Sequence, residues 1–454
     1  MYNQDAKPVL PEEVDSILKS LNHKGFEAYI VGGCVRDSTI GRAPADWDIA
    51  TAARPEQVKG IFEKTVDTGL KHGTVTVMVG AESFEVTTFR VDGEYEDARH
   101  PSSVEYTTSI EADLSRRDFT INAIAFHPDK EFVDPFGGIP DIGRKLIRTV
   151  GRADDRFQED ALRMLRAVRF SAQLGFSMDD EILRSIKANS RLISSISSER
   201  VRDELTRILV SGEPMKFVLL EETGLLQYVI PEFQRCFDTP QNHPYHIYDV
   251  AAHSLHAVAA IENDRCLRWA MLLHDIGKSV TRTTDDKGVD HFYGHPVKSE
   301  ALAEVILKRL RFDNRSIDRI LRLVRLHDRE IVPAQKAVAK AVCAVGEDIF
   351  EDLLKVKAAD KMAQNPKYRE KGLNTVAEVK RIYLDMKESG RCLALKDLAI
   401  NGSDLIGTGW PQGREIGRVL KQLLEKVIDE PGLNRKDRLL ELASELTIDR
   451  RPIK

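Results

Sequence analysis

Two aspartates, Asp46 and Asp48, stand two residues apart in the stretch RAPADWDIAT. Alternate residues of a β-strand point to the same face, so a strand here would bring the two carboxylates together. Adjacent carboxylates repel each other unless a cation lies between them, and hard oxygen ligands suit Mg²⁺ with a substrate phosphate. Glu85, in the alternating stretch SFEVTTFR, could add a third carboxylate from a neighbouring strand. The pattern predicts a magnesium site for phosphate chemistry, although a pair of aspartates alone is common by chance.

A glycine pair lies upstream, where YIVGGCVRD runs from an apolar stretch into Gly32 and Gly33 and then to Arg36. Glycine lets backbone N–H groups approach a phosphate closely, and a helix N-terminus favours an anion. A tight turn would explain the same glycines without any ligand. Beside the two aspartates, the glycines favour a site for a nucleoside triphosphate, where catalysis is mainly positioning and charge neutralisation.

The stretch EDALRMLRAVRF places Asp160 ahead of three arginines, Arg163, Arg166 and Arg169, at intervals of three. We expect one continuous helix here, with its apolar residues facing a core. Like charges at this spacing cost a few tenths of a kcal/mol, so the arginines need partners. A solvated face with surface salt bridges is the simplest alternative.

A second basic cluster lies in DLSRRDFTINA, which contains Arg116, Arg117, Asp118 and Asn122 ahead of an apolar stretch. These side chains could bind a nucleotide, or they could form a structural salt bridge. The residues alone do not decide between the two.

Further along, histidines and aspartates recur on segments that we expect to be mostly helical, at His253, His274, Asp275, His295 and Asp328. Side chains from separate helices that converge on one point are how helical bundles build metal sites. The order resembles the HD superfamily of metal-dependent phosphohydrolases, which implies a second divalent metal. A remnant of that fold acting as a scaffold is the alternative.

The length and composition of the chain limit its number of domains and its class of protein. A chain of 454 residues should form about two to four domains. Its net charge of −5 argues against a globally basic nucleic-acid coat, and its five cysteines form no CxxC pair. The first residues resemble no secretion signal and no apolar run reaches membrane-spanning length, so we expect a cytoplasmic protein without a membrane partner.

The order of the elements predicts an α+β head followed by a helical remainder. AYIVGG is a short apolar run, and TVTVMVG and SFEVTTFR alternate on either side of a turn, which predicts a hairpin. After about residue 150 the helical period dominates. We expect a head at 1–148, a neck at 149–212, a body at 213–388 and a tail at 389–454.

Six blocks, in order, resemble the class II nucleotidyltransferases, which comprise the CCA-adding tRNA nucleotidyltransferases and the bacterial poly(A) polymerases. The blocks are GGCVRD…GRAPADWDIAT, HGTVTV, DLSRRDFTINAIAF, DPFGG, RFQEDALRMLRAVRF and SSERVRDEL, between about residues 25 and 210. The resemblance implies a polymerase-beta-like nucleotidyltransferase head with catalytic residues Asp46, Asp48 and Glu85. It further implies Mg²⁺ as cofactor, CTP and ATP as substrates, and tRNA as partner.

The resemblance also implies that the neck is an amino-acid template for the incoming base. An aspartate accepts from an exocyclic amino group and an arginine donates to a ring nitrogen, so Asp160 and Arg163 could accept C and A but reject U and G. The nucleotide-binding residues that it implies are Gly32, Gly33, Arg36, Arg117, Asp118, Asn122, Asp160, Arg163, Arg166 and Arg169.

Two further segments bear on the reaction. By the same resemblance, the polar stretch at 91–113 is a flexible loop that helps to switch from C to A addition, and it is retained in full. The tail, with Arg414, Arg418 and Lys421 on one side of a helix, would grip tRNA. Addition of C, C and A to the tRNA 3′ end is therefore the expected function. The alternatives are an A-adding enzyme or poly(A) polymerase, a phosphohydrolase acting through the HD body, and a non-catalytic RNA-binding module.

Overall fold

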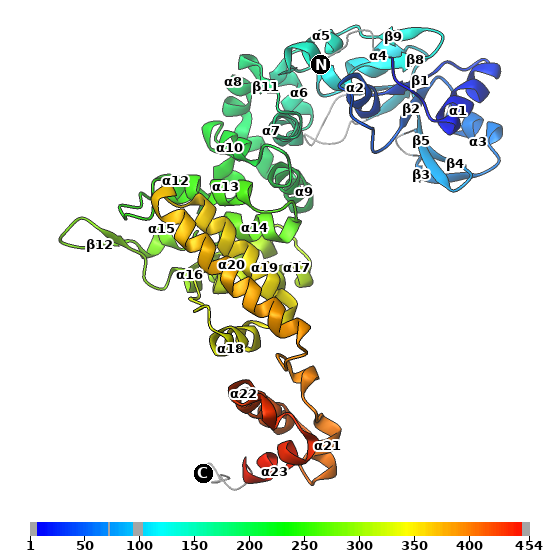
Figure 1. The fold of residues 1–454 in the computed structure, drawn as a ribbon. Coiled ribbons are helices and arrows are strands. Elements are labelled where there is room, and N and C mark those ends of the chain that lie inside the picture. Colours follow the sequence, from blue (N-terminus) through cyan, green and yellow to red (C-terminus); the bar gives the residue numbers. More distant parts are fainter. Residues whose placement is uncertain (1–6, 71–72, 94–102, 447–454) are drawn as a thin grey trace. The chain divides into compact units, whose positions relative to one another are not determined.

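A computed structural model describes residues 7–70, 73–93 and 103–446 of the chain. Its contacts divide the chain into two compact units, Met1–Pro231 and Glu232–Lys454 (Figure 1). Among the described residues, no helix is both long and apolar enough to span a membrane.

The head of the first unit is built on a seven-stranded sheet within these described residues, in the order β3-β4-β5-β2-β1-β8-β9. Neighbouring strands are antiparallel except β2 and β5, which run parallel. The expected hairpin is confirmed as β4 and β5. The strands are β1 (Ala28–Val31), β2 (Asp48–Thr51), β3 (Thr65–Gly69), β4 (Thr74–Val79), β5 (Glu82–Thr88), β8 (Ala125–His127) and β9 (Glu131–Val133).

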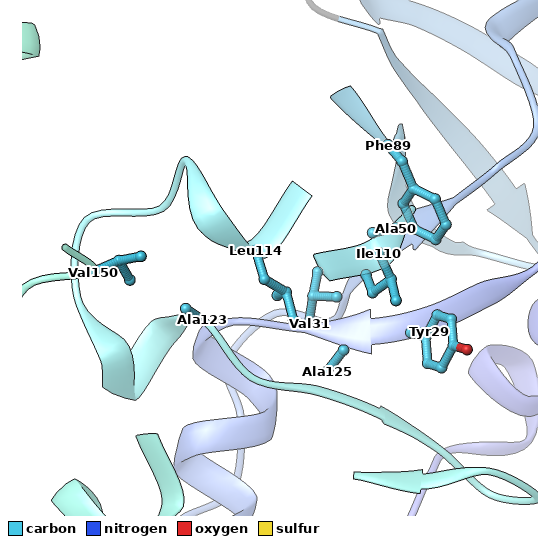
Figure 2. Packing of buried hydrophobic residues seen from close by; sticks show 9 residues of the cluster. All are labelled: Tyr29, Val31, Ala50, Phe89, Ile110, Leu114, Ala123, Ala125 and Val150. Carbon is cyan, nitrogen blue, oxygen red and sulfur yellow. The ribbon is translucent and has the colours of Figure 1, made fainter. Parts of the chain in front are cut away.

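One face of the sheet is covered by a short helix, α4 (Ile110–Ser115). Its Ile110 and Leu114 are buried in one cluster with Tyr29 and Val31 of β1 (Figure 2). Alternation along the strand turns Tyr29 and Val31 to the same face. The packing fixes the end of β1, directly before the glycine pair.

The stretch at 91–113, expected as an irregular loop, is partly structured. Strands β6 (Arg90–Asp92) and β7 (Val104–Tyr106) pair as an antiparallel ribbon, and the Ser109 hydroxyl caps α4. Residues 94–102 lie outside the described residues, as does His72 of the HGTV block. The other helical elements of the head are α1 (Glu12–His23), α2 (Gly33–Thr39), α3 (Pro55–Ile61), η2 (Thr120–Asn122) and α5 (Gly138–Arg144).

The neck contains a break where we expected one continuous helix. Helix α6 (Ala153–Glu159) ends one residue before Asp160, and α7 (Leu162–Leu174) begins two residues after it. The backbone of Asp160 is extended (φ −141°, ψ 103°), and its carboxylate accepts the N–H of Leu162 at 3.0 Å. Local capping by an aspartate competes with helix continuation. Asp160 therefore starts α7 rather than lying along it.

The rest of the neck is helical apart from one small parallel pair of strands. Residues 213–231, assigned to the body from the sequence, fall in the first unit, because the units divide after Pro231. The elements are β10 (Leu146–Ile147), β11 (Ser177–Met178), α8 (Asp180–Asn189), η3 (Ser190–Ser195), α9 (Ser198–Leu209), η4 (Pro214–Phe217), α10 (Val218–Glu222) and α11 (Leu226–Val229).

The second unit is a helical body with a helical tail. A short hairpin of β12 (Thr283–Thr284) and β13 (Asp290–His291) interrupts the expected all-helical pattern. The helices of the body, the first of which spans the boundary between the units, are α12 (Pro231–Phe237), α13 (Val250–Ala260), α14 (Arg265–Leu273), α15 (Lys278–Thr281), α16 (His295–Arg309), α17 (Asn314–Leu326), α18 (Gln335–Val345), α19 (Glu347–Ala363) and α20 (Pro366–Glu388). The tail comprises η5 (Leu395–Asp397), α21 (Gly402–Gly407), α22 (Arg414–Asp429), η6 (Pro431–Leu433) and α23 (Lys436–Leu446).

Candidate functional site

A cleft of about 500 Å³ in the first unit brings together all ten residues expected to bind a nucleotide, and Asp48. Half of its lining residues are arginines, which gives it the charge that a triphosphate requires. The expected residues that line it are Gly32, Gly33, Arg36, Asp48, Arg117, Asp118, Asn122, Asp160, Arg163, Arg166 and Arg169. Arg116, Phe170 and Arg200, which were not among them, line it too.

The expected catalytic carboxylates lie on two adjacent strands, β2 and β5, or directly before one of them. Asp48 is the first residue of β2 and stands opposite Glu85 in the parallel pair with β5. Asp46 precedes the strand in a bend, so strand alternation does not bring it beside Asp48 as we expected. All three residues line a second hollow of the head.

The carboxylates of Asp46 and Glu85 lie close enough to Asp48 to affect its pKa. Partial desolvation raises the pKa of Asp48 above its usual value, and the Glu85 and Asp46 carboxylates raise it further, while Arg117 opposes them. This oxygen-only set suits Mg²⁺ by its donor chemistry, and a bound cation would relieve the repulsion. Within the described residues, the oxygens of these three carboxylates do not all lie within 4.8 Å of one another. The ligand atoms of two groups of histidines and aspartates in the second unit do.

Gly32 leaves space for the side chain of Arg117 and does not offer its backbone N–H to a ligand. Its φ is +75°, and a Cβ atom there would lie 2.7 Å from Nη1 of Arg117. Its N–H donates to the carbonyl of Ile124 at 3.0 Å, so it is not directed at a ligand, contrary to our expectation for this residue. Gly33 begins α2 and meets no such restriction, because a Cβ there would lie 3.8 Å from the nearest neighbouring atom, Nη2 of Arg36.

A chain of hydrogen bonds crosses the cleft wall. Arg36 donates from Nη1 to Oδ1 of Asn122 at 2.6 Å, and Asn122 donates from Nδ2 to Oδ1 of Asp118 at 3.1 Å. The other Asp118 oxygen accepts from Nε of Arg166 at 2.7 Å. These hydrogen bonds link α2, η2 and α7 through side chains that we expected to contact the nucleotide.

The central carboxylate of this chain stays charged although it is buried. Burial alone would raise the pKa of Asp118, but Arg166 and Arg163 and the amide of Asn122 hold it well below its usual value. Asp118 is only 7 % exposed. The contacts favour a positioning role for Asp118, with Arg166 held at the edge of the cleft.

Asp160 and Arg163 both line the cleft but do not pair with each other. Oδ2 of Asp160 lies 2.9 Å from Nη2 of Arg200, on α9. Arg163 donates from Nη1 to Glu159 at 2.5 Å and from Nη2 to the carbonyl of Arg116 at 3.1 Å. Each side chain is therefore fixed by its own partners before any ligand binds.

The ring of Phe170 makes cation–π contacts with three arginines of the cleft. The guanidinium carbons of Arg36, Arg166 and Arg169 lie 5.1, 5.4 and 4.1 Å from the centroid of its ring. Such cation–π contacts hold arginines in place without neutralising them. Arg169 also lies 2.7 Å from Oε2 of Glu204, and burial lowers the pKa of Arg169 to about 10.

The second unit holds a separate set of buried histidines and aspartates. His253 comes from α13, His274 and Asp275 follow α14, and His295 begins α16; all four are buried. The structure brings these expected residues together, with Asp275 in two groups of potential metal ligands.

Asp328 does not take part in this set. It is exposed, and its neighbour His327, at the end of α17, points inward instead and lies 3.4 Å from Asp275. The phase of the helix end decides which of two adjacent residues faces the core. Asp360 of α19, 3.1 Å from His253, was missed because no motif surrounds it.

Comparison with known proteins links these features to known families. Residues 28–148 match the family model described as the poly A polymerase head domain. Residues 295–443 match the model for tRNA nucleotidyltransferase domain 2. These matches cover the sheet of the head and much of the second unit.

Relatives in sequence and in structure give the same result. A CCA-adding enzyme of Bacillus velezensis is 35% identical over 424 residues, which cover 92% of this chain and 94% of that protein. One of Geobacillus thermodenitrificans is 47% identical over 267 residues, where the chain spans 63% of the relative's length. The crystal structure of the Bacillus stearothermophilus CCA-adding enzyme in complex with CTP matches with a TM-score of 0.71 at 30% identity, covering 97% of this chain and 98% of that one.

Proposed function

The chain belongs to the family of CCA-adding enzymes, and we propose that it adds C, C and A from CTP and ATP to the 3′ end of tRNA. The observation that carries the proposal is the arginine-lined cleft beside Asp48, which gathers the expected nucleotide-binding residues in one place. The cleft has the charge for a triphosphate and a buried hydrogen-bonded wall to orient it.

Asp46, Asp48 and Glu85 are proposed as the catalytic carboxylates, which hold Mg²⁺. Bound there, the ion would neutralise charge on the reacting phosphates. Asp48 lines both the arginine-lined cleft and the hollow that Asp46 and Glu85 share, which supports a reaction beside this pair of strands. A tRNA 3′ hydroxyl then attacks the α-phosphate in line, and pyrophosphate leaves.

Asp160 and Arg163 are proposed to select the base. Asp160 accepts from the exocyclic amino group shared by cytosine and adenine, and Arg163 donates to the adjacent ring nitrogen. Arg200 and Glu159 hold these two side chains in place. Pre-organisation matters because ordering these side chains on binding would cost affinity.

Arg117, Arg166 and Arg169 are proposed to bind the phosphates. The tail helix α22, with exposed Arg414 and Arg418, is proposed to contact tRNA by shape and backbone charge. The reaction is proposed to take place in the cytoplasm.

The test uses purified protein with tRNAs that lack the whole CCA end, lack CA, or lack only the final A. Addition of C, C and A, of C and A, and of A respectively is expected. Addition of A to the third substrate without any addition to the first two would show an A-adding enzyme, and long A tracts would show a poly(A) polymerase.

A further inference from the structure

Phe170 lines the nucleotide cleft, although a phenyl ring has no group that can bind a phosphate. It lies on α7 and is 5 % exposed. A buried phenylalanine usually packs against the apolar side chains of a core. The ring centroid of Phe170 also lies within 5.4 Å of the guanidinium carbons of three arginines, Arg36, Arg166 and Arg169. The position of this ring therefore bears on the charge of the cleft as well as on its packing.

Phe119 anchors the ring of Phe170. The two ring centroids are 5.7 Å apart at an interplanar angle of 80°, which is the edge-to-face arrangement that aromatic pairs prefer. Phe119 is fully buried, and its N–H donates to Oδ1 of Asp118 at 2.8 Å. The ring of Phe170 is therefore fixed against the segment that carries the central carboxylate of the cleft wall.

The three arginines carry like charges close to one another, so they need neighbours that hold them in place. Each has a carboxylate neighbour of its own: for Arg36, Arg166 and Arg169 these are Asp37 at 2.8 Å, Asp118 at 2.6 Å and Glu204 at 2.7 Å, respectively. The three carboxylates come from different segments, so none of them sets the spacing between the arginines. The ring of Phe170 is a neighbour that all three guanidiniums share.

An aromatic ring holds a cation without occupying its hydrogen-bond donors. The electron-rich face attracts the guanidinium, and the attraction is stronger where water is excluded. A guanidinium has five N–H donors. The ion pairs occupy Nε and Nη2 of Arg166 and Nε of Arg169, so they leave donors on both side chains for the oxygens of a triphosphate. A carboxylate in place of the ring would instead cancel part of the charge that the phosphates need.

We propose that Phe170 is a positioning residue for the triphosphate of the incoming nucleotide. Its ring holds Arg36, Arg166 and Arg169 at a fixed spacing, and through them it sets the affinity of the cleft for phosphates. The inference rests on the proposed function and concerns the part of the substrate that CTP and ATP share. The ring should therefore affect both nucleotides equally and leave the choice of base unchanged.

The test changes the charge distribution of the ring and keeps its shape. Phenylalanine with one, two or three ring fluorines is incorporated at Phe170 of the full-length chain, because each fluorine withdraws electron density from the face and weakens its attraction for a cation. Equilibrium dialysis without tRNA measures the dissociation constants of CTP, ATP and inorganic pyrophosphate. All three constants should rise stepwise along the series, to about five- to thirtyfold for the ring with three fluorines.

Two outcomes would overturn the proposal. Constants that do not change along the series would show that the ring acts only through packing. A rise for CTP or ATP without a rise for pyrophosphate would show that the ring contacts the base. Because binding is measured without tRNA, the result for Phe170 stands even if the chain does not add C, C and A. Failure of the proposed function itself would appear in the addition assays.

A matched control uses another buried ring of the head. Phe126 of β8 is 2 % exposed, and its ring centroid lies 4.9 Å from that of Phe132. The same fluorinated residues at Phe126 should leave the three dissociation constants unchanged. Equal losses at Phe126 and Phe170 would assign the effect to packing and contradict the proposal.

A conventional variant gives a kinetic readout. Phe170→Leu keeps an apolar side chain but removes the aromatic face. KM for CTP and ATP should rise by the same factor, about five- to thirtyfold, while kcat changes less, because phosphate contacts are present in both the ground state and the transition state. A fall in kcat at unchanged KM, or a changed preference among the four nucleotides, would contradict the proposal. Circular dichroism checks folding, and if Phe170→Leu does not fold, the fluorinated series decides the matter.

Discussion

Arg166 of the neck holds Asp118 of the head by two nitrogens on one carboxylate oxygen, with Nε at 2.7 Å and Nη2 at 2.6 Å. The two residues are 48 positions apart, so this pair ties the nucleotide cleft to the packing of α7. Because Asp118 is buried, the pair should affect stability as well as nucleotide binding.

The Asp118 pair should make stability fall in acid. The folded protein holds the pKa of Asp118 below its usual value near 3.8, so its contribution is fully present above that value. The contribution is lost as the pH falls below 3.8 toward the folded pKa. Asp118→Asn should cost about 1–3 kcal/mol at pH 7, and the loss should shrink in acid. Urea unfolding of both proteins at several pH values measures this, and an equal difference at every pH would contradict it.

Gly32 and Gly33 should respond differently to alanine. Gly32→Ala introduces a side chain at φ +75° and 2.7 Å from Nη1 of Arg117, so Arg117 must move. We expect kcat/KM for CTP and ATP to fall about tenfold or more, which corresponds to about 1.4 kcal/mol. Gly33→Ala is the control and should change little, because its Cβ would be in ordinary contact with Arg36. Equal losses in both variants would show that the backbone N–H of Gly33, and not the position of Arg117, limits the reaction.

The head carboxylates should be required for addition but not for the fold of the body. Asp48→Asn should lower the rate of nucleotide addition by about a thousandfold, since several kcal/mol of transition-state stabilisation would be lost. Asp46→Asn should have a similar effect. Single-turnover assays with labelled ATP on tRNA lacking the final A provide the measurement. Near wild-type rates in either variant would rule out that residue as a catalytic ligand.

The sequence predicted the elements that follow a local pattern. Alternating residues in TVTVMVG and SFEVTTFR predicted the β4–β5 hairpin, and the register of β2 with β5 brings Asp48 beside Glu85 as expected. The short apolar run before Gly32 predicted β1. In these cases the alternation of apolar residues and the turn residues were sufficient to predict the strands, because the interactions that form them are between residues close in the chain.

Features that depend on distant partners were not predictable in this way. The break at Asp160 results from a local cap and from Arg200, 40 residues away on α9. Asp360 lies 107 residues beyond His253 and has no motif around it. The choice of His327 over Asp328 depends on how α17 ends against the body. Only the packed structure contains this information.

The most direct measurement of base selection is single-turnover incorporation of each of the four nucleotides by the wild type, Asp160→Ala and Arg163→Ala, on a tRNA that lacks CCA. Leaving one hydrogen-bonding group of the base unpaired costs about 1–3 kcal/mol, or about ten- to a hundredfold in selectivity. We therefore predict that both variants lose preference for CTP and ATP over UTP and GTP, in addition to any fall in melting temperature caused by losing the contacts of Asp160 with Leu162 and Arg200 or of Arg163 with Glu159. A uniform loss of all four activities with a lower melting temperature, or an unchanged preference for C and A, would contradict the template.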